Sequence, residues 1–189
     1  FEFVFKMFGE GLALIPKGGI EEISKQLRNK LQKTKIHFNT LVSKVNNKEI
    51  TLSGGEKINN HYAIIATEPS GLVGSLKNQA IDWKSCQNLY FTCSSRVYKK
   101  AFIGLVTSQE SLINNIFYPT SIETTKKGEG ELISVTVVKE HNLSEKELIE
   151  RVKKELKKEC KIEGLSFLKL YNIPRALPDL KNLQYDISP

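Results

Sequence analysis

The sequence has few cysteines and no long apolar segment. Cys86, Cys93 and Cys160 are odd in number and widely spaced, so they fit neither a disulfide framework nor a zinc site. The apolar run "YAIIA" at 62–66 is far too short to span a bilayer. The opening residues lack the basic region and the cleavage site of a signal peptide. These absences predict no membrane span and no metal site, and they favour a reducing, cytoplasmic setting.

The sequence also lacks the motifs that bind phosphate groups. No G-x-G-x-x-G is present, and the lysine of "PKGG" at 16–19 precedes the glycines, whereas a Walker loop needs it after them. No G-x-S-x-G is present either, and His37, His61 and His141 are isolated from one another. The residues therefore offer no self-sufficient catalytic site, and the glycine pair is expected only to permit a turn before a helix.

Positive charge exceeds negative charge. The chain has 28 Lys and Arg residues against 21 Asp and Glu residues, a net charge of +7. The lysines are spread along the chain and mostly alternate with acids, which does not favour nucleic-acid binding. A basic, non-enzymatic module that binds an acidic partner or nucleic acid nevertheless stays open as an alternative function.

Periodicity and turn signals predict the elements of the first half. Apolar residues three and four apart predict a helix over 18–33. Two short strands are expected in 36–45 and 49–52, joined by an Asn-Asn-Lys turn. A Gly-rich turn follows at 53–57, and the compact apolar run at 61–67 predicts a buried strand.

The second half adds further strands and one more helix. Ser144 and Glu147 form a capping-box pattern that predicts the start of a helix. Strands are expected in 89–95, 99–108, 114–121, 130–140 and 165–173, where Pro174 and Pro178 are expected to end regular structure. The fold class predicted is α/β (α+β), with a mixed, largely antiparallel sheet and helices.

Four segments of the first half form an ordered series: "IPKGGIEEISKQLRNKL", "IHFNTLVSKV", "ITLSGGEKI" and "AIIAT". This series resembles the flavin-dependent amine oxidase and phytoene dehydrogenase superfamily. The later segments "WKSCQNLYF", "GELISVTVV", "SEKELIERVKKEL" and "YNIPRALP" resemble the substrate domain of its phytoene dehydrogenase-like branch. The resemblance covers nearly the whole chain.

The resemblance implies a middle fragment of an FAD-dependent oxidoreductase. It implies that 1–15 end a substrate-domain segment, 16–70 form part of the FAD-binding domain, and 71–189 form the substrate-binding domain. The loop that holds the FAD pyrophosphate would lie before Phe1. FAD is therefore expected in the full-length protein, whereas this chain alone is expected neither to hold FAD tightly nor to turn over.

The resemblance also suggests cofactor contacts. Val42 matches the valine whose backbone faces the adenine of FAD, and Ala66 and Thr67 match a strand end that passes close to the cofactor. The sequence departs from the family pattern at His61, where an acid is common, and at Glu68, which separates the Ala-Thr pair from the next proline.

The expected substrate is a small apolar or amine compound that would pass a hydride to the flavin, and no catalytic residue is indicated. Tyr90, Phe91 and Tyr171 are interpreted as core residues, with lining of a substrate cavity as the alternative.

Overall fold

The computed structural model describes residues 6, 9–10, 14–76, 82–125 and 128–179, which fall into two compact units. The larger unit holds the described residues of 1–30 and 83–177. The smaller unit holds those of 31–82 together with Pro178 and Asp179. The domain boundaries predicted after residues 15 and 70 concern cofactor and substrate binding, and they remain predictions.

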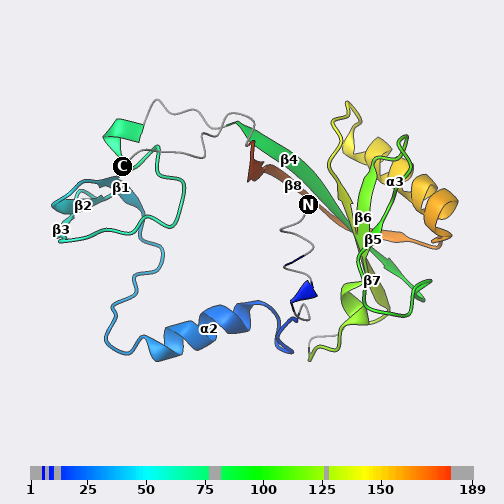
Figure 1. Cartoon of the computed structure of the whole chain (residues 1–189), viewed down its shortest axis with the longest axis horizontal. Helices are drawn as coiled ribbons and strands as arrows, with labels where there is room; N and C mark the ends of the chain where they lie inside the picture. Colours follow the sequence, from blue (N-terminus) through cyan, green and yellow to red (C-terminus); the bar gives the residue numbers. More distant parts are fainter. Residues whose placement is uncertain (1–5, 7–8, 11–13, 77–81, 126–127, 180–189) are drawn as a thin grey trace. The chain divides into compact units, whose positions relative to one another are not determined.

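The described residues form an α+β fold with two antiparallel sheets, which confirms the predicted class (Figure 1). The helical elements are α2 (Glu21–Lys30), η1 (Gly74–Leu76), η2 (Pro119–Ser121) and α3 (Glu145–Cys160). The strands are β1 (Val42–Val45), β2 (Glu49–Leu52), β3 (Lys57–Asn59), β4 (Trp83–Cys93), β5 (Gly104–Leu105), β6 (Ile113–Phe117), β7 (Glu131–Val137) and β8 (Ser166–Pro178). None of these helices is long and apolar enough to cross a membrane.

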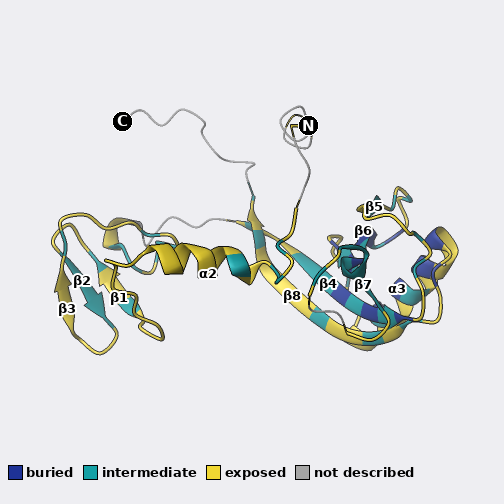
Figure 2. Cartoon of the chain, turned by 90° about the horizontal axis from the view of Figure 1, so that it is seen from below, coloured by how far each residue is buried: buried dark blue, intermediate teal, exposed yellow. Residues whose placement is uncertain are grey.

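The larger sheet has the strand order β5-β6-β7-β4-β8, and α3 packs on one of its faces (Figure 1). Side chains alternate along β4 and β7, because successive residues of a strand point to opposite faces. Leu89, Phe91, Ile133 and Val135 are fully buried on the face toward α3 (Figure 2). The apolar side of α3 completes this core with Leu148, Val152 and Leu156.

The start of α3 confirms the predicted capping box. Ser144 accepts a hydrogen bond from the backbone N–H of Glu147, and the Glu147 carboxylate accepts one from the N–H of Ser144 at 2.8 Å. These bonds pair two of the backbone donors that a helix start leaves without intrahelical partners. The hydrogen bonds with Ser144 also lower the pKa of Glu147.

The last strand is longer than predicted. β8 continues through Pro174 and ends at Pro178, so the expectation that regular structure ends at Pro174 is wrong. β8 is an edge strand, and one side of an edge strand has no ladder partner, so a proline there need not remove a ladder bond. The N–H of Asp179 then donates to the carbonyl of Asp82 at 2.7 Å, which fastens the end of β8 to the start of β4.

The smaller sheet has the order β1-β2-β3, and its two turns match the predicted ones. The Asn46 side chain accepts from the N–H groups of Lys48 and Glu49, which closes the first turn. Gly55, with φ of 88°, supplies the left-handed backbone of the second turn. Within this unit, no side chain that the structure describes is buried.

The predicted buried strand at 61–67 is not formed. The segment has no strand conformation, and Tyr62 and Ile64 are 93% and 96% exposed. A strand needs a neighbouring strand for its backbone hydrogen bonds, and the described β1, β2 and β3 do not pair with this segment.

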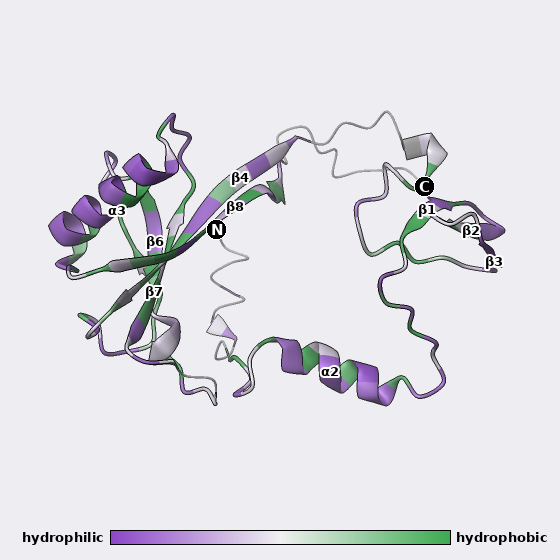
Figure 3. Ribbon diagram, turned by 180° about the vertical axis from the view of Figure 1, so that it is seen from behind, coloured by the Kyte–Doolittle hydropathy of each residue, from purple (hydrophilic) through white to green (hydrophobic). Residues whose placement is uncertain are grey.

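The helix predicted over 18–33 is formed as α2, with shorter bounds and the predicted amphipathic pattern. α2 follows a turn in which the N–H of Gly19 donates to the carbonyl of Pro16 at 2.9 Å, and Gly19 has φ of 97°. Apolar and charged residues alternate around the helix (Figure 3). Ile23 and Leu27 are nevertheless 49% and 59% exposed, so the apolar stripe of α2 is present but not buried.

Candidate functional site

The face of the larger sheet opposite α3 carries polar and aromatic side chains that are half-buried or exposed. We call it the open face and define it by Asn88, Tyr90, Ser134, Lys169 and Tyr171. Asn88 and Tyr90 alternate with the buried residues of β4, and Ser134 alternates with those of β7. The strand register pairs Tyr90 directly with Ser134, so these side chains lie on one continuous surface.

Hydrogen bonds and ring contacts connect the open face. The Ser134 hydroxyl donates to Oδ1 of Asn88 at 2.9 Å, and Nδ2 of Asn88 donates to the Tyr90 hydroxyl oxygen at 3.2 Å. The rings of Tyr90 and Tyr171 meet edge to face, with centroids 5.8 Å apart. Lys169 Nζ lies 5.9 Å from the centroid of the Tyr171 ring. The three aromatic residues that the sequence singled out therefore lie on two different faces of the sheet. Tyr90 and Tyr171 lie on the open face, whereas Phe91 lies in the core against Phe167.

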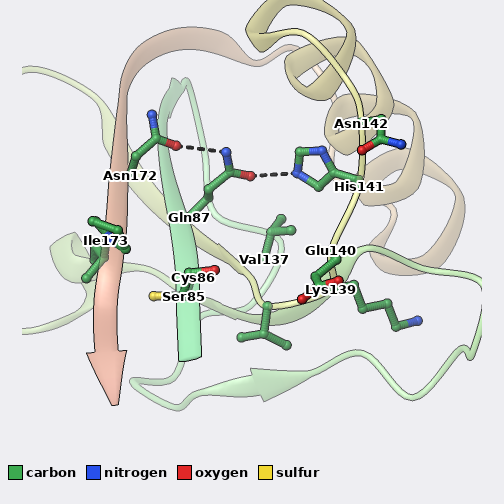
Figure 4. Close-up of a pocket in the computed structure, with 12 residues that line it drawn as sticks. Ser85, Cys86, Gln87, Val137, Lys139, Glu140, His141, Asn142, Asn172 and Ile173 are labelled. Atoms are coloured by element: carbon green, nitrogen blue, oxygen red, sulfur yellow. Dashed lines mark hydrogen bonds between the residues drawn. The ribbon is translucent and has the colours of Figure 1, made fainter. Parts of the chain in front are cut away.

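A second feature is a pocket of about 460 Å³ beside β4, β8 and the segment before α3 (Figure 4). Gln87 lies at its centre, with Nε2 donating to Oδ1 of Asn172 at 2.8 Å and Oε1 lying 2.6 Å from Nε2 of His141. The N–H of Leu143 donates to Nδ1 of His141 at 3.3 Å, so the Nε2 atom carries the ring proton and donates to Gln87. These hydrogen bonds link three separate segments.

No sequence motif indicated this pocket. His141, Gln87 and Asn172 are far apart along the chain, and each alone is an ordinary polar residue. Only the pairing of β4 with its neighbours and the turn before α3 bring them together. His37 and His61 are exposed and lie in the smaller unit.

Glu155 is the buried carboxylate of the larger unit, with 6% of its surface exposed. Its Oε2 accepts from the Ser111 hydroxyl at 2.7 Å and from the N–H of Leu112 at 2.9 Å, and its Oε1 accepts from Arg151 at 2.6 Å. Burial alone would raise the pKa of Glu155, but these hydrogen bonds outweigh burial and lower it. Since both oxygens are engaged, Glu155 holds α3 to the segment before β6 and is not placed for acid–base chemistry.

The cysteines behave as small apolar residues. Cys93 and Cys160 belong to the core, and burial raises the pKa of both thiols. Cys86 is half-buried. Among the residues that the structure describes, no three His, Cys, Asp or Glu side chains are grouped so that they could hold a metal ion.

The outer face of α3 is basic but interleaved with acids. Ion pairs join Lys153 to Glu150 at 3.1 Å and Lys157 to Glu163 at 2.9 Å. Such exposed pairs contribute little stability, but they mix the two signs of charge along the helix. This arrangement is typical of a solvated helix, and we expect the protein to leave a heparin column at low salt.

The cofactor residues expected from the resemblance lie in the smaller unit. Val42 is the first residue of β1, an edge strand. The carbonyl of Leu41 accepts from the N–H of Ser53 at 2.8 Å and so faces β2. The carbonyl and N–H of a trans peptide point in opposite directions, so the Val42 N–H points away from β2, to the outer edge of β1. Further along this edge, the N–H of Val45 donates to the carbonyl of Leu72 at 2.9 Å. Ala66 and Thr67 are exposed, at the end of the segment that was expected to form a strand.

The chain is similar to known proteins both in sequence family and in fold. The sequence matches the family model "Flavin containing amine oxidoreductase" over residues 1–166. The PF1083 protein from Pyrococcus furiosus is similar in fold, with a TM-score of 0.67 and 17% identity over 89% of this chain. A reduced UDP-galactopyranose mutase has a TM-score of 0.66 and 15% identity over 87% of this chain. A candidate protoporphyrinogen oxidase from Exiguobacterium sp. 255-15 has a TM-score of 0.58 and 14% identity over 85%.

This chain spans less than half of each of those structures. It covers 44% of the Pyrococcus furiosus protein, 41% of the mutase and 40% of the Exiguobacterium protein. At these identities the likeness establishes the fold alone. No curated protein matches the sequence.

Proposed function

The chain belongs to the family of flavin containing amine oxidoreductases, and from this premise we propose that the full-length protein is an FAD-dependent oxidoreductase that transfers a hydride from a small substrate to the flavin. The family match over residues 1–166 carries this proposal, because it includes the whole smaller sheet and four strands of the larger one. The "YNIPRALP" segment in β8 supports a place in the phytoene dehydrogenase-like branch, and the cysteine pattern supports a cytoplasmic setting.

In this proposal, residues 16–70 form part of the FAD-binding domain and Val42 binds the adenine. The outward N–H of Val42 supports the assignment, because a backbone donor that points away from the neighbouring strand can bond an adenine nitrogen without a special side chain. Ala66 and Thr67 are small enough to let the cofactor approach the backbone closely. The sequence lacks a pyrophosphate-binding motif, so we assign the remaining FAD contacts to the rest of the full-length protein.

The exposed apolar residues of 16–70 support the same assignment. The stripe on α2 and the run at 62–66 are apolar surfaces that a complete domain would bury. We propose that both pack against the remainder of the FAD-binding domain, and that the run at 62–66 becomes a strand there.

The larger unit is proposed to supply the substrate side. The flavin, when bound, accepts the hydride, while the residues of the open face bind and orient the substrate. The packing of the larger sheet supports this role, since α3 buries one face, whereas the described polar and aromatic side chains of the other face are half-buried or exposed.

A substitution that removes only a backbone donor tests the cofactor assignment. Val42→Pro deletes the N–H at a position where an edge strand tolerates proline. In the full-length protein we expect the Kd for FAD to rise roughly tenfold, the effect of losing one hydrogen bond of about 1.4 kcal/mol. Val42→Ile keeps the N–H and serves as the matched control. Unchanged FAD affinity in a folded Val42→Pro protein would contradict the assignment of Val42.

The isolated chain gives a second test. FAD added to residues 1–189 is expected to produce no shift of the flavin absorbance spectrum, because most of the cofactor site is assigned elsewhere. Tight binding with a clear spectral shift would show that this chain holds a complete site.

A further inference from the structure

We propose that the open face recognises a ring-bearing substrate with an anionic or carbonyl group and discriminates against a protonated amine. This inference rests on the proposed function, since it concerns the substrate of the same site. It departs from the expectation of a small apolar or amine substrate. Three properties of the larger sheet carry it: its charge, the direction of its hydrogen bonds, and the contact made by the Tyr171 ring.

The five strands of the larger sheet carry a single acidic residue, Glu131. Its carboxylate is bonded to Arg96 at 3.1 Å and to the Thr120 hydroxyl. Glu131 also shares the strand phase of the buried Ile133 and so belongs to the face toward α3. The open face therefore presents no carboxylate from these strands, whereas it carries the ammonium group of Lys169. A substrate cation would find no opposite charge from these strands on the open face.

The hydrogen bonds of the open face leave donors available to a ligand. Ser134 donates to Asn88, and Asn88 in turn donates to the Tyr90 hydroxyl oxygen. A hydroxyl that accepts in this way retains its own proton, so Tyr90 can donate outward from the sheet. The Lys169 ammonium group is also only a donor. Both groups suit a carboxylate or carbonyl oxygen, which only accepts.

The aromatic pair does not offer a free cage for an ammonium ion. Aromatic faces can attract cations, and Tyr90 with Tyr171 would be the candidate here. Lys169 Nζ, however, already lies 5.9 Å from the Tyr171 centroid, so a second cation at that ring would meet a like charge. The two rings, which meet at 88°, instead offer an edge and a face for packing against a planar ring of the substrate.

The test uses the full-length protein with its flavin, and two probes that differ in charge. Benzoate and benzylamine are titrated separately under anaerobic conditions, and binding is followed by the change in flavin absorbance. We expect benzoate to perturb the flavin spectrum and to bind more tightly than benzylamine. Lys169→Met is expected to raise the benzoate Kd about tenfold, as expected for the loss of one charge-assisted hydrogen bond.

Two further variants make the result specific. Lys154→Met removes a lysine from the exposed side of α3 and should leave the benzoate Kd unchanged. Tyr90→Phe removes only the proposed outward donor and should weaken benzoate binding while a circular dichroism spectrum stays unchanged. An effect of Lys154→Met equal to that of Lys169→Met would overturn the proposal, because it would indicate a general charge effect.

Other outcomes separate this inference from the proposed function. A full-length protein that binds no FAD would contradict the proposed function itself. A flavin-loaded protein in which benzylamine binds more tightly than benzoate, or in which neither probe perturbs the flavin, would overturn the substrate inference and leave the cofactor assignment intact.

Discussion

The two sheets of this chain differ in what they bury. In the larger sheet, Leu89, Phe91, Ile133 and Val135 have no exposed surface, and α3 closes the core over them. In the smaller unit, no described side chain is buried, and Ile64 is almost fully exposed. Both sheets have antiparallel ladders, each with a register shift, so strand pairing does not distinguish them. The difference indicates that the larger sheet has its own hydrophobic core, whereas the described residues of the smaller unit form none.

Truncating one apolar residue in each unit should give the largest contrast. Phe91→Ala is expected to lower the free energy of unfolding of this chain by about 3–5 kcal/mol, because it leaves a cavity in a packed core. Ile64→Ala should change it by less than about 0.5 kcal/mol, because the side chain is already in water. Urea unfolding followed by circular dichroism measures both. Equal losses would mean that the exposed run is packed in solution, and the comparison would fail.

The buried carboxylate should give the next largest effect. Glu155→Gln is expected to cost roughly 2–3 kcal/mol, because Arg151 loses its charged partner and the bonds from Ser111 and Leu112 weaken. Glu150→Gln, in an exposed pair with Lys153, should cost about 0–0.5 kcal/mol and serves as the control. Thermal unfolding at neutral pH measures the difference.

The effect of Glu155 should depend on pH with a definite sign. Because its pKa is lowered in the folded protein, its ionised form stabilises the fold above the unfolded pKa of about 4.3. That contribution is lost as the pH falls through the folded pKa, so the wild-type protein and Glu155→Gln should converge in stability under acid. If the difference in stability between the two proteins stayed constant as the pH fell below about 4.3, the lowered pKa of Glu155 would be contradicted.

The helices provide the smallest contrast. α3 has a capping box and a buried side, whereas α2 has an exposed apolar stripe and follows Ile20, whose side chain cannot cap a helix. Ser144→Ala should therefore cost about 1 kcal/mol in the unfolding of the larger unit, whereas Ser144→Thr keeps a capping hydroxyl and should cost less. Thermal melts of the two variants check this prediction, and equal losses would contradict a capping role.

Local patterns in the sequence predicted the elements that depend on local contacts. The capping box at Ser144, the Asn46 turn and the glycine turn before β3 were each confirmed, because their hydrogen bonds join residues a few positions apart. The prediction for 61–67 was wrong because burial of an apolar run depends on a neighbour that its own sequence does not specify. The prediction ended β8 too early, because the sequence does not reveal that this strand lies at a sheet edge, where proline is tolerated.

Less of the candidate site than of the fold could be predicted from the sequence. Val42 was found only by resemblance, since a backbone contact leaves no mark on composition, and its cofactor role remains a proposal. The open face could not be assigned because Tyr90 and Tyr171 belong to strands at opposite ends of the larger unit's sequence. The pocket at His141 was not predicted for the same reason, because Gln87 and Asn172 are brought together only by the pairing of their strands.

The hydrogen bond between Asp179 and Asp82 bears on how residues 83–178 could be exchanged during evolution. The two ends of the segment between them meet in space, as the ends of an inserted domain do. Residues 83–178 can therefore be exchanged as one unit by recombination at two points that lie close together, before Trp83 and after Pro178. Exchange at these points would replace the open face while leaving Val42 and the smaller sheet untouched. If the proposed function is correct, recombination at this position would change the substrate preference and leave the proposed FAD contacts at Val42 unchanged.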